Sequence, residues 1–410
     1  MNKNKILNDP IYGFITIYSE LIFDVIEHPY FQRLRRIKQL GLTDLVYPGA
    51  NHTRFHHAIG CMHLMEKALE SLRNKGYRIS DYEFESTLLA ILLHDIGHGP
   101  FSHCLEHTLL QKVPHEAISL LFMERLNEEF DGELNLAIQI FKGEYERAFF
   151  HQLVSSQLDI DRMDYLNRDS FFTGVTEGLV SADRLIKMLE IVNDEIVVAE
   201  KGIYSVENFL NSRRLMYWQV YLHKTTICAE EMLIQIVKRA KYLIQNGEKL
   251  ETTPALSHFF KNNYTLENFQ TNPTLLTAFG KLDDYDIWSG IKLWVDSKDH
   301  ILKTICNMLM DRRLYKILLF KEEIGSMFLE DIEARICKQY KVSQEDLPYL
   351  RVKGMLSNYG YIASGKRIKI LKKNGEIVDI SEASDLPNIK AISEVVKKYY
   401  LCIPNLTVEN

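Results

Sequence analysis

The densest set of side chains that could do chemistry lies in residues 92–103, which read LLHDIGHGPFSH. An apolar run leads into His94 and Asp95, and an imidazole beside a carboxylate is a ligand pair suited to Fe, Mn, Zn or Mg rather than to metals that prefer sulfur. Gly97 and Gly99 then allow the backbone to turn sharply. Two adjacent ligands do not complete a metal site, so the remaining ligands must come from other segments.

Histidine is concentrated around this segment, because nine of the 14 histidines lie between His52 and His115. His57, in RFHH, is one candidate for a further ligand, and Asp161, in DIDRMDY, is another. A single histidine on an apolar helix is more often a structural residue than a ligand. The complete pattern of an apolar helix, His-Asp, two glycines and two more histidines favours a metal site instead. The candidate ligands are His57, His94, Asp95 and Asp161.

Two other sets of residues share a helix face by their spacing. A helix through residues 159–169 places Asp161, Tyr165 and Asp169 nearly on one face. A helix through residues 206–245 carries a second set at spacings of 4, 4 and 3, namely Arg213, Tyr217, Tyr221 and Lys224. Its two cations, with Arg54, could hold a triphosphate. A solvated basic face with amphipathic tyrosines explains the same spacing.

A mostly helical chain must position these residues, since the dominant hydrophobic period is helical. A proline is expected to split residues 20–40 into two helices at His28-Pro29. Further helices are expected at residues 57–75, 82–95, 115–130, 133–141, 146–157, 181–191, 206–245 and 286–320, with short helices over 246–285. Strand signals are few: residues 196–199 and 202–205 are expected to form one hairpin, and residues 367–371 and 376–380 another, around an Asn-Gly turn.

The composition is that of an ordinary globular protein of 410 residues, with 46% hydrophobic and 25% charged residues. A change in pattern near residue 325 predicts a core over residues 1–325 and a small α+β lobe over residues 326–410. The net charge of −6 argues against a protein that coats nucleic acid. Scattered cysteines predict free thiols in a reducing cytoplasm, and neither a signal peptide nor a membrane span is expected.

The sequence resembles the HD-domain phosphohydrolases, and within them the branch that hydrolyses deoxynucleoside triphosphates (dNTPs) to deoxynucleoside and inorganic triphosphate. The resemblance covers roughly residues 5–320 and is carried by residues 31–41, 47–57, 94–103, 159–169 and, more briefly, 221–224. The C-terminal part matches loosely, and the SAM domain of the vertebrate enzyme has no counterpart here. The resemblance implies a helical HD core, a divalent metal cofactor (Mn, Fe, Mg or Zn) and a dNTP substrate.

The resemblance also implies roles for single residues. The family's metal ligands match His57, His94, Asp95 and Asp161. Residues on its α-phosphate side match His98 and His103, its catalytic histidine matches His115, and Glu106 stands where it has an orienting aspartate. Taken one at a time, a supporting or packing role is the alternative for these three histidines.

The substrate contacts of the family fall on the two helix faces described above. Tyr165 matches the residue at the sugar, where a tyrosine ring would exclude a 2′-hydroxyl. Asp169, joined by Gln39, matches the contact to the 3′-hydroxyl. Further contacts match Arg54, Arg213, Tyr221 and Lys224, next to Tyr217, and Arg162 replaces a lysine of the vertebrate enzyme.

The vertebrate relative forms tetramers that bind nucleotides between subunits, which implies a homo-oligomer here, a dimer or a tetramer, with an activating dNTP or GTP. Its regulatory contacts fall on Lys5, Asn8, Glu27, Arg35, Arg184, Arg312 and Lys316. Glu27 replaces an aspartate that reads guanine, and Ala199 replaces an arginine at the second activator. Ordinary surface salt bridges are the alternative for these residues.

Two other functions fit part of the pattern. One is an HD phosphohydrolase that acts on another nucleotide or phosphoester, against which the residues at the sugar and the triphosphate argue. The other is a nucleotide-sensing or nucleic-acid-binding module without dNTPase activity. Its signature would be the loss of a metal ligand or of His115, and the sequence retains all of them.

Overall fold

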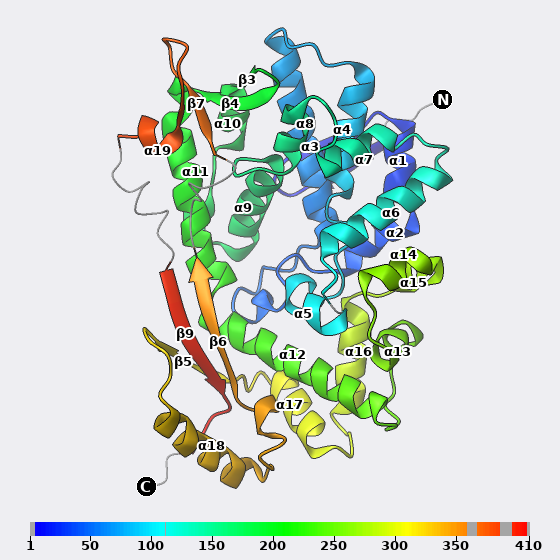
Figure 1. Cartoon of the computed structure of the whole chain (residues 1–410), viewed down its shortest axis with the longest axis vertical. Coiled ribbons are helices and arrows are strands. Elements are labelled where there is room, and N and C mark those ends of the chain that lie inside the picture. Colours follow the sequence, from blue (N-terminus) through cyan, green and yellow to red (C-terminus); the bar gives the residue numbers. More distant parts are fainter. Residues whose placement is uncertain (1–4, 111, 359–366, 386–395, 408–410) are drawn as a thin grey trace.

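The structure, a computed structural model, describes residues 5–110, 112–358, 367–385 and 396–407. Helices make up most of the chain, with three small sheets beside them (Figure 1). The expected fold class, mostly helical with few strands, is confirmed. None of the described helices combines the length and the hydropathy that a membrane crossing requires.

Three helices form the centre of the molecule. α3 (Arg54–Asn74) packs against both α4 (Asp81–Leu93) and α9 (Ile160–Thr173). Residues 88–93 of α4 are all buried, as expected of a helix enclosed by a core. The termini of these three helices carry the candidate metal ligands, so the packing of the core determines where those ligands lie.

The other helices expected before residue 200 are present. Pro29 is the first residue of α2, and His28 caps that helix, which confirms the split at the proline. These helices are α1 (Glu20–Glu27), α2 (Pro29–Gln32), α6 (His115–Glu129), α7 (Asn135–Lys142), α8 (Ala148–Val154) and α10 (Ala182–Met188). A further helix, α5 (Ser102–Leu109), lies in a segment for which no helix was expected. The short helices expected over 246–285 are α13 (Pro254–Lys261), α14 (Leu266–Thr271) and α15 (Pro273–Phe279).

The prediction of a single helix over residues 206–245 is wrong. α11 (Ile203–Met216) passes into a π-helical turn, Tyr217–Tyr221, and α12 (Lys224–Gln245) begins after a break. His223 has an extended backbone, and its Nδ1 accepts the Thr225 N–H at 3.2 Å. The sequence around this break contains no proline or glycine, and the helical hydrophobic pattern continues through it, so the break could not be seen from the sequence. Arg213 and Lys224 consequently do not share one helix face.

The helix expected over residues 286–320 is also interrupted. It is replaced by α16 (Asp284–Trp294), α17 (His300–Met310) and strand β5 (Lys316–Phe320). The Asp299 side chain starts α17 by accepting the Leu302 N–H at 2.8 Å. A helix-capping aspartate within an apolar pattern therefore begins α17, after α16 has ended at Trp294.

The first expected hairpin has the wrong partner strand. β4 (Glu195–Ala199) pairs with β3 (Leu189–Val192), which the sequence analysis placed in a helix, while residues after 202 begin α11. Asn193 and Asp194, both at positive φ, form the two-residue turn between these strands. Two such residues suit a type I′ turn, and this signal was missed. The second hairpin is confirmed as β7 (Lys369–Leu371) with β8 (Ile377–Asp379).

Strand pairings link the C-terminal residues to the preceding part of the chain. β9 (Val396–Ile403) lies between β5 and β6 (Val352–Asn358), and α18 (Ser326–Tyr340) lies beside this sheet (Figure 1). β7 pairs in parallel with β4. The β5–β9 and β4–β7 pairings each join a strand before residue 325 to one after it. The division into a core and a lobe at that residue stays a prediction.

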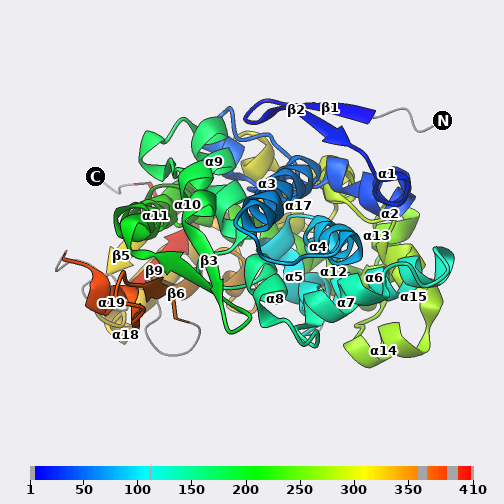
Figure 2. The same ribbon diagram turned by 90° about the horizontal axis from the view of Figure 1, so that it is seen from above.

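A hairpin that the sequence analysis did not expect opens the chain. It joins β1 (Lys5–Asp9) to β2 (Gly13–Ile17) and lies above α3 in Figure 2. Asp9 closes the turn by accepting the N–H groups of Ile11 and Tyr12 at 2.9 and 3.0 Å. The other carboxylate oxygen of Asp9 faces into the core.

Glu83 stabilises the start of α4 and therefore the helix that ends at His94. Burial opposes its ionisation, but hydrogen bonds from Ser80, Arg147 and Tyr145 lower the pKa of its carboxyl to about 2. We expect Glu83→Gln to reduce the free energy of unfolding by about 1–2 kcal/mol at neutral pH. Because the pKa is lowered in the folded state, this contribution is complete above pH 4.5 and is lost as the pH falls toward 2.

Chemical denaturation of the variant and the wild type between pH 2 and 7 measures this effect. Asp81→Asn is the matched control, because that acid is in the same helical turn but is fully exposed. A stability difference that stays constant across this pH range would contradict the role given to Glu83.

Candidate metal centre and active site

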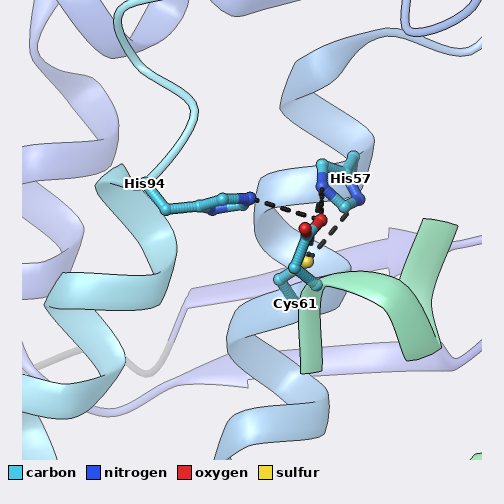
Figure 3. Close-up of side chains that lie close together, drawn as sticks. His57, Cys61 and His94 are labelled. Atoms are coloured by element: carbon cyan, nitrogen blue, oxygen red, sulfur yellow. Dashed lines mark hydrogen bonds and ion pairs between the residues drawn. The ribbon is translucent and has the colours of Figure 1, made fainter. Parts of the chain in front are cut away.

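Three segments bring their donor atoms to one point in the core. His57 lies in the first turn of α3, His94 follows α4, and Asp161 lies in the first turn of α9. His57 Nε2 is 3.1 Å and His94 Nε2 is 3.5 Å from Asp161 Oδ1. The two imidazoles approach each other from neighbouring helices, with Cys61 close by (Figure 3). These four side chains could hold a divalent metal ion.

The donor set fits such an ion. Donors that share a tetrahedral or octahedral ion at about 2.1 Å lie about 3 Å apart, which is close to the separations found here. His94 Nε2 is buried and faces the carboxylate oxygens of Asp95 and Asp161 at 3.4 and 3.5 Å, whereas His94 Nδ1 lies 2.6 Å from the Ile91 carbonyl oxygen. That second contact fixes the ring with Nε2 toward the other donors, as in metal-binding histidines.

Asp95, the fourth expected ligand, lies at the edge of this group. Its Oδ1 is 3.4 Å from His94 Nε2 and its Oδ2 is 3.7 Å from His57 Nε2, and Arg54 also donates to it. Cys61, which sequence analysis did not single out, has its Sγ 3.6 Å from His57 Nε2. Burial raises the pKa of this thiol, whereas metals take the thiolate. The carboxylate of Asp95 is therefore the better donor of the two.

Opposite charges compensate one another in this cluster. Burial opposes ionisation of Asp161, but hydrogen bonds and charges from His57 and His94 hold its pKa well below the usual range. Burial also opposes protonation of His94, yet Asp95 and Asp161 raise the pKa of its imidazole. A metal ion must displace protons from these imidazoles. Metal affinity should therefore fall as the pH falls.

A series of buried charged residues supports His57 on the Nδ1 side of its ring, opposite the Nε2 that faces Asp161. His57 Nδ1 is 2.8 Å from Asp164 Oδ2, and Arg168 donates to both oxygens of Asp164 at 2.9 and 3.0 Å. Arg168 also donates to Asp9 of β1 at 2.8 Å. Gly60 makes room for this pair, because a Cβ there would lie 2.1 Å from Arg168 Nη2. The N-terminal hairpin is thus connected to a candidate metal ligand.

Two other histidines of the cluster, His98 and His115, lie on one side of Asp95. His98 Nε2 is 3.3 Å from Asp95 Oδ1, and the His98 and His115 rings stack with centroids 3.8 Å apart. His115 Nδ1 lies 2.9 Å from Glu106 Oε1, the pairing that the sequence analysis expected. Burial, followed by the charge of Arg54, lowers the pKa of His98 well below its usual range. His103 is on α5, and its side chain lies outside the described part of the structure.

Asp169 is the centre of a separate polar group, two turns along α9 from Asp161. Tyr221 donates to Asp169 Oδ2 at 2.7 Å, and His52 Nε2 lies 2.8 Å from Oδ1. The Tyr165 ring packs edge-on against Tyr221, with centroids 6.1 Å apart. Sequence analysis gave no role to His52. Its signal was only its place in the histidine cluster, because the contact joins residues 117 positions apart.

Several polar groups near these tyrosines are buried without a hydrogen bond among the described residues. They are Arg162 Nε, Arg213 Nε, Arg213 Nη1 and Gln39 Oε1. Arg162 otherwise pairs with Asp159, and Tyr217 packs against Tyr221 with ring centroids 5.2 Å apart. Buried N–H groups without a partner, on the half-buried Arg162 and the buried Arg213, are suited to an anionic ligand. Lys224 is exposed at the start of α12.

The seven residues expected at regulatory contacts are all exposed, and only Lys5 and Asn8, both on β1, share an element. Lys5 and Arg35 lie over the aromatic rings of Phe23 and Phe55. Arg184 donates to Ser205 Oγ at 3.0 Å, and Arg312 donates to the Leu45 carbonyl oxygen at 2.8 Å. Asn8, Glu27 and Lys316 complete the set.

Comparison with known proteins decides the family. The HD domain family matches residues 54–169, and the HD associated region matches residues 180–253. A crystal structure of a phosphohydrolase from Bacteroides thetaiotaomicron superposes with a TM-score of 0.95 at 49% identity, covering 98% of this chain and 100% of that one. The chain belongs to the HD-domain phosphohydrolase family.

Curated relatives of this HD phosphohydrolase differ in what is known of them. The Bacillus subtilis protein YwfO, whose name assigns no activity, is 34% identical over 94% of this chain and 88% of its own length. The Dictyostelium discoideum homologue of SAMHD1, named a deoxynucleoside triphosphate triphosphohydrolase, is 31% identical over 61% of this chain and 52% of its own length. These relatives and the HD domain match support the conclusion that this chain is a hydrolase with a metal-binding HD domain.

Asp164 offers a test of the metal centre that leaves every candidate ligand in place. In Asp164→Asn the charge behind His57 is lost, and we expect metal affinity to fall about 10–100-fold. Titration of the metal-free protein with Mn²⁺ measures the affinity. Asp183→Asn, an exposed acid that pairs with Lys67, is the control. Equal Mn²⁺ affinity of the Asp164 variant and the wild type would refute the support given to His57.

Proposed function

We propose that this HD phosphohydrolase hydrolyses dNTPs to deoxynucleoside and inorganic triphosphate. The observation that carries the proposal is the layout of α9. Asp161, in its first turn, lies beside His57 of the candidate metal site, and Asp169 lies two turns later, hydrogen-bonded to His52 and Tyr221. One rigid helix would thus hold both the phosphate and the sugar of a nucleotide.

The residues around this helix would each have a separate role in the reaction. Water attacks the α-phosphorus, the bond from phosphorus to the 5′-oxygen breaks, and the deoxynucleoside leaves as its alcohol. His115, held by Glu106 at 2.9 Å, donates the proton that the 5′-oxygen takes up. His98 and His103 would face the α-phosphate. A divalent ion bound to His57, His94, Asp95 and Asp161 would polarise a phosphate oxygen.

The cations would bind the triphosphate, which carries about four negative charges. Arg162 and Arg213 have buried N–H groups to offer, and planar guanidinium groups suit phosphate oxygens. Arg54 is already engaged by Asp95 and Ser102, so it would orient the metal ligand as well as contact phosphate. Lys224, Tyr217 and Tyr221 would border the same ligand.

Sugar selection would come from Tyr165, Asp169 and Gln39. The Tyr165 ring, fixed against Tyr221, would occupy the space of a ribose 2′-hydroxyl. Asp169 and the unused Gln39 Oε1 would accept from the 3′-hydroxyl. The proposal extends to a cytoplasmic homo-oligomer, activated by a dNTP or GTP at the seven exposed regulatory residues.

Product analysis with each of the four dNTPs and with GTP, in Mn²⁺, Fe²⁺, Mg²⁺ or Zn²⁺, tests the proposal. We expect intact triphosphate and deoxynucleoside in equal amounts from at least one dNTP, and no triphosphate from GTP. Addition of dGTP or GTP to another dNTP should raise the rate if the regulatory residues act. Release of pyrophosphate or monophosphate instead of triphosphate would contradict the reaction, and identical rates with and without the activators would contradict the regulation.

A further inference from the structure

The turn between the metal-binding Asp95 and α5 has a backbone that its own residues do not favour. Phe101 and Ser102 have φ values of 51° and 41°, although neither is glycine. Side chains disfavour this left-handed region. Such a turn persists when contacts from the rest of the fold hold it, and it is often found at active sites. The contacts that hold this turn are therefore of functional interest.

One carboxylate reaches the turn from a distant part of the chain. Asp284, the first residue of α16, is 4% exposed, and its Oδ1 accepts the Phe101 N–H at 2.8 Å. Its Oδ2 accepts the Lys38 N–H at 2.9 Å. Both oxygens therefore bind main-chain groups, one on each of two segments that enter the active site.

Both segments lead to Arg54. On one side, the Ser102 hydroxyl accepts a hydrogen bond from Arg54 Nε at 2.7 Å. On the other, the Ile37 carbonyl accepts the Arg54 backbone N–H at 2.9 Å. The guanidinium group of Arg54 then pairs with Asp95, a candidate metal ligand. Asp284 is thus connected to Arg54, beside the candidate metal centre, both through the Phe101–Ser102 segment and through the Ile37–Lys38 segment.

The Lys38 segment also carries a residue of the sugar site. Lys38 pairs with Thr53 in an isolated antiparallel bridge, and the Gln39 N–H donates to the His52 carbonyl at 3.0 Å. His52 in turn contacts Asp169. Asp284 is therefore connected to the phosphate side of the proposed site through Phe101 and to its sugar side through Lys38.

We propose that Asp284 is a positioning residue, whose carboxylate holds the 37–39 and 97–102 segments in register so that Arg54, Asp95 and Gln39 face one substrate. Asp284 does not touch the substrate. This role rests on the proposed site and holds for any phosphate ester hydrolysed there. A displacement of about 1 Å in such a residue is enough to lower a rate about 100-fold.

The test compares Asp284→Ala and Asp284→Asn with Asp286→Asn in the full-length chain. Asp286 is the matched control, because it is an acid in the same first turn of α16, but it bonds to Thr253 and to the Asp283 N–H instead of to the two segments. Hydrogen–deuterium exchange of peptides over 35–41 and 97–104 reports the positions of the segments. Steady-state release of triphosphate from dGTP with Mn²⁺ reports kcat and KM.

We expect Asp284→Ala to lower kcat about 100-fold and to speed exchange in both peptides about tenfold or more. Asp284→Asn keeps one acceptor and should be intermediate in both measurements. Asp286→Asn should stay within about twofold of wild type in both. If Asp284→Ala does not fold, the two asparagine variants carry the comparison.

Two results would overturn the proposal: unchanged exchange in both peptides of the Asp284 variants, or equal losses of kcat in Asp284→Asn and Asp286→Asn. The second result would mean that Asp284 only stabilises α16. If the wild-type protein releases no triphosphate from any dNTP, the proposed reaction fails. The exchange measurement then still decides the role of Asp284.

Discussion

The carboxylate of Asp161 is the group on which the arrangement of the active site depends. It lies where α3, α4 and α9 meet, 3.1 Å from His57 and 3.5 Å from His94. Burying any one of these charged groups alone would be costly, so each needs the others or a metal ion in their place. The core must therefore pack in the one way that brings three helix termini together. The apolar residues 88–93 and the capped start of α4 serve that requirement.

The same constraint extends outward from the metal centre through hydrogen-bonded charges. Asp164, Arg168 and Asp9 connect His57 to the N-terminal hairpin. Gly97 lets α6 approach closely, because a Cβ there would lie 2.2 Å from the His115 carbonyl oxygen. That close approach allows the stacking of His98 on His115. The surrounding contacts thus position the candidate catalytic groups as well as stabilise the fold.

Much of the site could be predicted from the sequence because its residues sit in short, dense motifs. The His94-Asp95 pair, the capped α9 and the pairing of His115 with Glu106 are all local in sequence or recurrent in a known family. The roles given to these residues remain predictions, although the geometry brings most of them together. His52 and Cys61 were missed because their significance lies in contacts across the fold.

The errors in the fold arose where local chemistry overrides periodicity. The break at His223 comes from a side-chain cap within an uninterrupted apolar pattern, and the β3–β4 turn depends on two residues at positive φ. Asp284 could not have been found from sequence, because its partners Lys38 and Phe101 are 246 and 183 residues away. A hydrogen bond to the main chain of a distant segment cannot be predicted from the pattern of residue types in the sequence.

The most direct measurement of the central claim is metal content together with triphosphate release in wild type and Asp161→Ala. The account predicts about one divalent ion per wild-type chain, and loss of both the ion and the release of triphosphate in a variant that remains folded by circular dichroism. A folded Asp161→Ala protein that retains its metal ion and hydrolyses dNTPs at the wild-type rate would contradict it.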